Sequence, residues 1–235
     1  MLPRLTFLSS IKLVQNAPRK WKCYLLGILT AGLANLGSPG NVHARPVSYP
    51  GGTTLLLAND ADSHNFAALY TAWPHWAIGY SGSYFPEKEW SLQTIEFDWL
   101  CLRWNGAEGQ ASAYLKGALG TACSRTFSRC KPGWQTGISL DWESRRYFVL
   151  YQNQLTYGQG FQTAYRQKGR LGIAPYIGQY GDLHTWLMLQ VEHAPSGARH
   201  KLTLTPLVRF FKGQYLWELG VSLHGGVLLN GVIRF

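Results

Sequence analysis

The chain has 235 residues, enough for one domain or two small ones, and only 14% of them are charged, against roughly 25% in an ordinary soluble domain. With 46% apolar and 14% aromatic residues, extensive disorder is excluded, and the many Gly, Tyr and Trp residues favour strands and tight turns. The net charge of +10 would suggest an anionic partner such as nucleic acid. However, five of the 22 basic residues lie in the first 22 positions, and without them 17 basic face 12 acidic residues, a modest excess.

The first 44 residues have the pattern of an export signal. The basic segment Arg19–Lys22 precedes a mainly apolar run of 14 residues, 23–36, and Val42-His43-Ala44 offers small or aliphatic residues where a signal peptidase reads. The run is shorter than the ~20 residues that a membrane-spanning helix needs, which disfavours the alternative of a membrane anchor. We therefore expect a signal peptide over residues 1–44, cleaved before Arg45, and a mature chain that enters an oxidising compartment without a nucleic-acid partner.

The remainder of the chain shows period-two alternation of apolar and polar residues, which is typical of strands. No later stretch is apolar for 18 consecutive residues. Turn residues divide residues 45–235 into about twelve strands, within a range of about 8 to 14, an even count as bacterial barrels require. The expected strands are 52–59, 64–73, 76–85, 90–104, 109–121, 133–142, 145–155, 161–173, 181–193, 200–211, 214–223 and 226–235.

Strand length distinguishes a membrane barrel from a soluble sandwich, because both show this alternation. The aromatic-bounded segments Trp76–Tyr84 and Trp134–Trp142 each cover eight residue steps. At ~3.3 Å per step and ~40° tilt they span roughly 20 Å, close to the ~25 Å apolar band of an outer-membrane barrel. If the last strand runs toward the periplasm, the longest loop, Cys123–Pro132, falls outside the cell, and 73–75, 143–144 and 212–213 become tight periplasmic turns.

The chain ends in Gly231-Val232-Ile233-Arg234-Phe235, with apolar residues at alternating positions before a terminal Phe. This ending resembles the C-terminal signal of Gram-negative outer-membrane β-barrel proteins. The resemblance implies an all-β, antiparallel transmembrane barrel in the outer membrane, embedded in its lipids. It also implies that Phe235 is an assembly signal read by the barrel-assembly machinery. It indicates a class of protein and no particular functional family, and the oligomeric state stays open.

Charged residues within the strands are expected to face the lumen, because an Arg at the bilayer midplane costs ~2–4 kcal/mol. Their mixed signs favour a salt-bridged filling of side chains over a strongly selective pore. The predicted lumen-facing polar residues are Asp141, Arg146, Asp182, His184, Gln190, Glu192, Arg209 and Glu218.

Candidates for chemistry are few. Asp182 and His184 share one strand face and could form part of a hydrolase, although no Ser accompanies them and ordinary lumen packing is the favoured interpretation. Asp60, Asp62 and His64 alternate as metal ligands would, but a solvated hairpin loop explains them better, so neither a metal nor another cofactor is expected.

Cys123 and Cys130 flank a short loop and could form a disulfide in an exported protein, or remain free thiols.

Three functions remain open at this stage. The leading hypothesis is a non-enzymatic integral outer-membrane barrel with a narrow polar lumen, which conducts small solutes or serves a structural role. The second is an outer-membrane lipid or peptide hydrolase. The third is a soluble periplasmic β-barrel that binds an apolar ligand, with the same alternation and reversed faces.

Overall fold

A computed structural model describes residues 47–124, 129–161, 163–179, 181–196 and 200–235. The predicted signal peptide, with its cleavage after Ala44, lies outside these residues. Twelve strands make up the described chain, and a short 3-10 turn, Pro86–Lys88, follows the third of them. The strands are β1 (Thr53–Asn59), β2 (His64–Trp73), β3 (Trp76–Phe85), β4 (Trp90–Asn105), β5 (Gly109–Ser124), β6 (Cys130–Ser144), β7 (Tyr147–Gly158), β8 (Ala164–Ile173), β9 (His184–Ser196), β10 (Leu202–Lys212), β11 (Tyr215–Val221) and β12 (Val227–Arg234).

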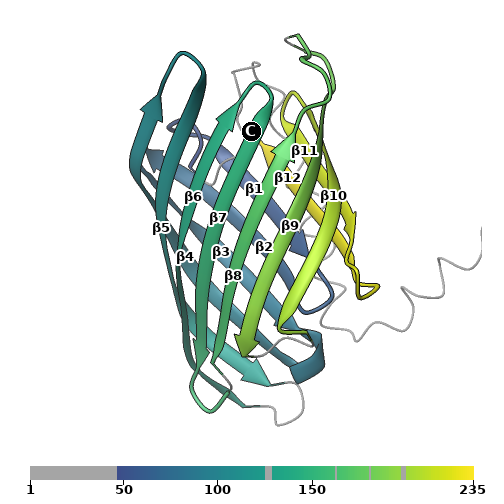
Figure 1. The fold of residues 1–235 in the computed structure, drawn as a ribbon. Helices are drawn as coiled ribbons and strands as arrows, with labels where there is room; N and C mark the ends of the chain where they lie inside the picture. Colours follow the sequence, from purple (N-terminus) through teal and green to yellow (C-terminus); the bar gives the residue numbers. More distant parts are fainter. Residues whose placement is uncertain (1–46, 125–128, 162, 180, 197–199) are drawn as a thin grey trace, which may run out of the picture. The chain divides into compact units, whose positions relative to one another are not determined.

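The strands form one closed antiparallel barrel in which each strand pairs with its sequence neighbours (Figure 1). The barrel closes where β12 pairs with β1, from Thr54 opposite Arg234 to Asn59 opposite Leu229. Two backbone hydrogen bonds between Thr53 and Phe235 extend this pairing to the last residue. Because closure leaves no unpaired strand edge, the backbone hydrogen-bonding groups of the wall are satisfied within the sheet. The predicted fold class, an all-β antiparallel barrel of about twelve strands, is confirmed.

The alternation along each strand separates an apolar outer face from a mostly polar lumen. On β9, for example, Leu187 and Leu189 are 48% and 43% exposed, whereas Met188 between them is 5% exposed and Gln190 after them is 2% exposed. Exposed apolar side chains occur in the same way around the barrel: Ile78, Ile95, Leu119, Ile138, Val149, Leu171, Leu219 and Leu229. Among the described residues, no helix is long and apolar enough to cross a membrane.

Strand β4 contains a bulge between Leu100 and Leu102 that changes which residues face inward. Before the bulge the even-numbered residues, such as Leu100, point into the lumen, whereas beyond it Arg103 pairs with the buried, inward-facing Ser112. Trp104 and Leu102 are instead 56% and 64% exposed on the outer face. The bulge thus keeps aromatic and aliphatic side chains outside as the strand leaves the middle of the barrel.

The loops lie at two ends, which we call the terminal end, where Thr53 and Phe235 lie, and the distal end, where loop 60–63 lies. All the distal connections are short, and the longest connection, 174–183, joins β8 to β9 at the terminal end. The expectation that the longest loop is 123–132 is therefore wrong. Strands β5 and β6 continue past the predicted limits and leave only 125–129 between them, while β9 begins at His184 rather than 181.

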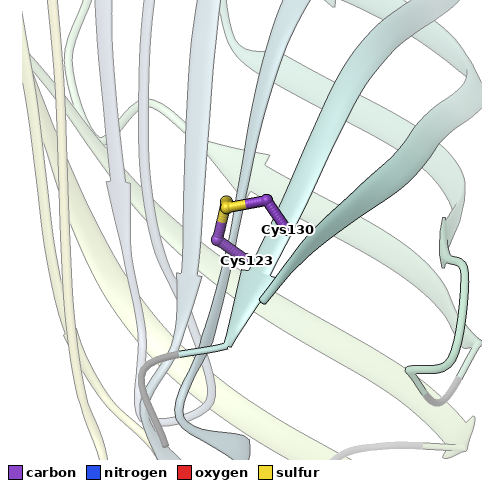
Figure 2. The surroundings of a disulfide bond; sticks show 2 residues. All are labelled: Cys123 and Cys130. Carbon is purple, nitrogen blue, oxygen red and sulfur yellow. A yellow bond between two sulfur atoms is a disulfide. The ribbon is translucent and has the colours of Figure 1, made fainter. Parts of the chain in front are cut away.

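A disulfide joins Cys123 on β5 to Cys130 on β6 (Figure 2). The two residues are direct partners across the antiparallel pair, with their Cα atoms 4.1 Å apart. The bond closes the tip of this hairpin at the distal end. Cys101, which the sequence places in mid-strand, is an exposed free thiol.

Candidate functional site

Glu218 on β11 is the centre of an ion-pair network on one side of the lumen. Its Oε1 lies 2.6 Å from Nη1 of Arg170 and 2.8 Å from both Nε and Nη2 of Arg209, and Asn230 donates to its Oε2 at 2.7 Å. Arg209 also lies over the ring of Phe148, with its guanidinium carbon 4.3 Å from the ring centre. These groups come from β7, β8, β10, β11 and β12, so the network joins widely separated strands through the barrel interior.

The network continues along β8 and β9 toward the distal end. Arg170 donates to Oε1 of Gln190 at 2.5 Å, and Gln190 donates to Glu192 at 3.3 Å. The other carboxylate oxygen of Glu192 lies 3.0 Å from Nε of Arg166. A continuous chain of hydrogen bonds therefore runs from Glu218 to Arg166.

Arg166 then reaches across the lumen to the loop between β1 and β2. Its Nη1 lies 2.9 Å from Oδ2 of Asp60 and donates to Oγ of Ser63 at 3.2 Å. Asp60 in turn accepts the backbone N–H groups of Asp62 and Ser63 on Oδ1, at 2.9 and 2.7 Å. Four strands separate β1 from β8 along the shorter way round the barrel, so this contact, which we call the distal latch, spans the distal mouth.

The ionisation of Asp60 reflects this setting. Burial of the carboxyl opposes its ionisation, but the positive charge of Arg166, helped by Lys168 and the two backbone N–H donors, outweighs burial and lowers the pKa of Asp60. Asp60 is therefore a carboxylate near neutral pH, and the distal latch is a true ion pair.

A second cluster of charged side chains, with more acidic than basic residues, lies on the opposite wall of the lumen, on β4 and β5. Lys116 on β5 lies 3.2 Å from Glu96 and 3.1 Å from Asp98, both on β4. Nearby, the hydroxyls of Ser81 and Thr94 share a buried 2.7 Å hydrogen bond. One lysine thus faces two carboxylates here.

Apolar packing fills the lumen at the terminal end. Val47, which precedes β1, is 1% exposed and packs against inward-facing side chains that include Leu69, Leu100 and Tyr114. The segment before β1 is held there by hydrogen bonds from Ser48 and Gly51 to the side chain and backbone of Thr71 on β2. We call residues 47–52 the terminal strap.

A second apolar cluster lies on the other side of the lumen and runs across the strands from the terminal end of β7 to the distal end of β12: Phe148, Trp186, Met188, Leu207 and Leu228.

Between the apolar end and the distal latch lies a cavity of about 330 Å³. Its walls include Lys168, Arg170 and Arg209 on one side and Glu96, Ser139 and Asp141 on the other. Apolar side chains also line it, and three of them come from the terminal ends of their strands: Phe148, Trp186 and Leu216. The size lies at the lower limit of the ~300–1,000 Å³ of typical ligand sites.

The structure brings most of the predicted lumen residues together. Gln190, Glu192, Arg209 and Glu218 belong to the network described above, and Asp141 lines the cavity.

Two predicted lumen residues do not face the lumen. Arg146 lies exposed in the two-residue bend between β6 and β7, because β7 begins at Tyr147 and not at the expected residue 145. Asp182 lies exposed in the 174–183 connection and accepts the backbone N–H of Gln179 at 2.8 Å. Both predictions were wrong because the strands start later than the alternation indicated.

The structure does not support a catalytic or metal-binding arrangement among the weak candidates. His184 opens β9 at the rim, with its ring 6.1 Å from that of Phe211, while Asp182 is engaged with Gln179. Asp60 is held by Arg166, whereas His64 is exposed and stacks with Tyr84 at 6.3 Å. Within the described ranges, no group of three or more His, Cys, Asp or Glu side chains is placed to hold a metal ion.

Four basic residues of the lumen escaped the sequence interpretation: Lys116, Arg166, Lys168 and Arg170. On β8, Arg166, Lys168 and Arg170 alternate with Gln167 and Gly169, so all three point to the same face. The expected strand 161–173 contains this period-two pattern, but its basic residues are not among the lumen residues predicted from the sequence.

Comparison with known proteins adds little to this description. No protein-family model matches the sequence, and no curated protein matches it. Among solved structures, the chain is similar to that of OccK11 (OpdR) from Pseudomonas aeruginosa, with a TM-score of 0.41 and 11% identity, over 84% of this chain and 73% of that one. A likeness of this degree assigns no function to the chain.

Proposed function

We propose that the chain is an integral outer-membrane β-barrel protein, held by outer-membrane lipids and inserted by the barrel-assembly machinery. The observation that carries the proposal is the facing of the wall, in which apolar side chains cover the outside and ionised ones meet inside. Exposed apolar surface around a closed barrel suits lipid and not water. Aromatic residues on the outer face near the terminal end have the position of an interfacial girdle: Trp76, Trp99, Trp104, Tyr147 and Tyr215.

The same facing weighs against a soluble periplasmic barrel with an apolar ligand in its centre, which would need the opposite arrangement. The hydrolase alternative lacks support as well, because Asp182 and His184 do not form a paired site.

Within the membrane, we assign the lumen the role of a narrow passage or binding chamber for small polar solutes. The distal latch and the terminal strap restrict the two mouths, and side chains fill much of the space between them. Solute flux should therefore be far smaller than through the open 16–18-stranded porins.

Location is tested by fractionating the membranes of a Gram-negative host that expresses the full chain. Recovery in the outer membrane, with migration on a gel that changes after boiling, supports the proposal. Recovery in the soluble periplasmic fraction overturns it.

Deletion of Phe235 should lower the outer-membrane yield more strongly than the yield of refolding from urea into detergent micelles. An unchanged yield in cells would contradict the proposed role of Phe235 as an assembly signal.

Conduction is tested by swelling of liposomes that contain the purified barrel. Tyr114 is 1% exposed within the apolar packing at the terminal end, so Tyr114→Ala should widen the lumen and raise the swelling rate in small sugars. Tyr70→Ala is the matched control, because Tyr70 is 49% exposed on the outer face. Equal rates for both variants and the unmodified protein would contradict a passage through the lumen.

A further inference from the structure

Two histidine rings stack on each other at the distal end of the barrel. His200 lies in the connection between β9 and β10, His224 lies in the turn between β11 and β12, and both side chains are exposed. Their ring centres are 3.9 Å apart and their planes lie within 11° of parallel. The two residues are distant in the sequence, so it is the pairing of neighbouring hairpins along the rim that brings their rings together.

Backbone hydrogen bonds fix the segments that carry the two rings. The N–H of Leu223, next to His224, donates to the carbonyl of Leu204 on β10 at 2.9 Å. On the other hairpin, the N–H of Ala194 donates at 2.8 Å to the carbonyl of the residue that follows His200. Each ring therefore belongs to a residue beside an anchored backbone position, and little conformational freedom is lost when both rings engage one ligand.

The nitrogens of both rings are available to a ligand. Among the described residues, neither imidazole makes a hydrogen bond or an ion pair. Two positively charged rings would repel each other at this distance, so the stack favours neutral imidazole. Neutral imidazole is also the form that binds a transition metal, because the ring must supply a lone pair.

We propose that His200 and His224 form a binding site for a divalent transition-metal ion, Zn²⁺ or Ni²⁺, at the distal end of the barrel. Each ring supplies one nitrogen, and water occupies the remaining coordination positions. Nitrogens that lie ~2.0–2.1 Å from a tetrahedral zinc are about 3.3 Å from each other. Rings whose centres are 3.9 Å apart reach this arrangement by tilting about their side-chain bonds, without movement of the backbone.

The ligand set defines which ions fit and how they are held. Imidazole suits zinc and nickel, whereas magnesium and calcium require oxygen ligands. The described residues provide no group of three or more His, Cys, Asp or Glu side chains around one point, so this is not a closed structural site with four protein ligands. The bound ion keeps open positions and exchanges readily, and it joins two neighbouring hairpins at the rim.

The test is titration calorimetry with the full barrel in detergent, purified without a polyhistidine tag. The titrants are zinc chloride, nickel chloride and magnesium chloride. All proteins carry Cys101→Ser, because the exposed thiol of Cys101 is itself a zinc ligand. We expect one zinc or nickel ion per barrel and no binding of magnesium at the same concentrations. Absence of saturable binding of zinc and nickel, or equal binding of magnesium, would overturn the proposal.

Variants of the two histidines identify the site. His200→Ala and His224→Ala should each weaken zinc binding by about tenfold or more, because a single imidazole lacks the gain of a second, tethered ligand. The double variant should lose no more than either single one, since removal of one ring already breaks the chelate.

His64→Ala is the matched control for these variants. It removes an exposed imidazole from the same end of the barrel, where the ring stacks on Tyr84 and not on a second histidine. This variant should bind zinc as the protein with both histidines does. Unchanged affinity in His200→Ala and His224→Ala, or an equal loss in His64→Ala, would mean that scattered surface histidines bind the metal and would refute the site.

A second measurement separates loss of the site from loss of the fold. Zinc should raise the urea midpoint of unfolding of the protein with both histidines, and it should leave the midpoint of folded His224→Ala unchanged. An equal rise in both proteins would contradict a site that includes His224.

The site is independent of the proposed location and of conduction. A barrel that reaches the outer membrane but binds neither metal overturns this inference alone. Recovery of a metal-binding chain in the soluble periplasm overturns the proposed function and supports the site.

Discussion

Removal of the Glu218 charge should destabilise the barrel strongly. This carboxylate lies within 2.8 Å of two guanidinium groups, Arg170 and Arg209, and its side chain is only 4% exposed. Glu218→Gln keeps the shape of the side chain but leaves two buried cations without their shared counterion. Breaking a buried pair in this way costs about 3–5 kcal/mol, so the free energy of unfolding should fall by that amount.

The assay is equilibrium unfolding in urea of the barrel refolded in liposomes. Glu108→Gln is the matched control, because it removes the same charge from an exposed position in the turn after β4 and should change the free energy by no more than about 0.5 kcal/mol. In addition, Glu218→Gln combined with Arg170→Gln should recover part of the loss, since one orphaned cation is removed. A cost below about 1 kcal/mol for Glu218→Gln would refute the reasoning and indicate that water in the lumen solvates these charges.

Three further outcomes follow from the structure. Leu189→Arg, at mid-strand on the outer face, should cost about 2–4 kcal/mol in bilayers, against about 0–1 kcal/mol for Leu202→Arg at the distal rim; equal costs in urea unfolding would contradict the membrane facing. Replacing Cys123 and Cys130 by Ser should lower stability by about 2.5 kcal/mol, the entropy of closing so short a loop, and reduction of the unmodified protein should reproduce the loss in thermal unfolding. The pKa of Asp60 is lowered in the folded protein, so its carboxylate stabilises the fold at pH values above its unfolded pKa of about 3.9, and this contribution is lost as pH falls through the lower folded pKa. The difference in unfolding free energy between the unmodified protein and Asp60→Asn should therefore shrink over that pH range. A constant difference would argue against the ion pair.

The strands could be predicted from the sequence because their signal is local. Alternation and turn residues identified all twelve, and the limits of β2 and β3 agree with the structure to the residue. The errors occur where a local signal misleads. In Lys168-Gly169-Arg170 the glycine weakens the alternating pattern, yet Gly169 occupies an outward position in a strand whose basic residues face the lumen. Likewise, β5 and β6 extend to their disulfide because pairing between the strands continues past the last alternating residues.

The composition of the lumen network could not be predicted, since its contacts join distant parts of the chain. Asp60 and Arg166 are 106 residues apart, and Arg170 and Glu218 are 48 apart. Alternation assigns each of these side chains to the inner face, but which strands face one another across the lumen depends on how the barrel closes. The terminal strap was missed for a related reason, because nothing in the sequence near Val47 indicates that it packs inside the barrel.

The two mouths of the cavity are closed by interactions of different strength. At the terminal end, Val47 and Tyr114 are each 1% exposed, and fully burying an apolar side chain contributes about 1.5–3 kcal/mol. At the distal end, Asp60 and Arg166 are 22% and 17% exposed, and a partly exposed ion pair contributes only about 0–1 kcal/mol net. The distal latch therefore opens at the lower cost, and acid or salt weakens it without affecting the apolar packing. If the lumen is the passage proposed above, the distal mouth is therefore the easier one to open, and a solute admitted there would first meet Arg166 and Lys168.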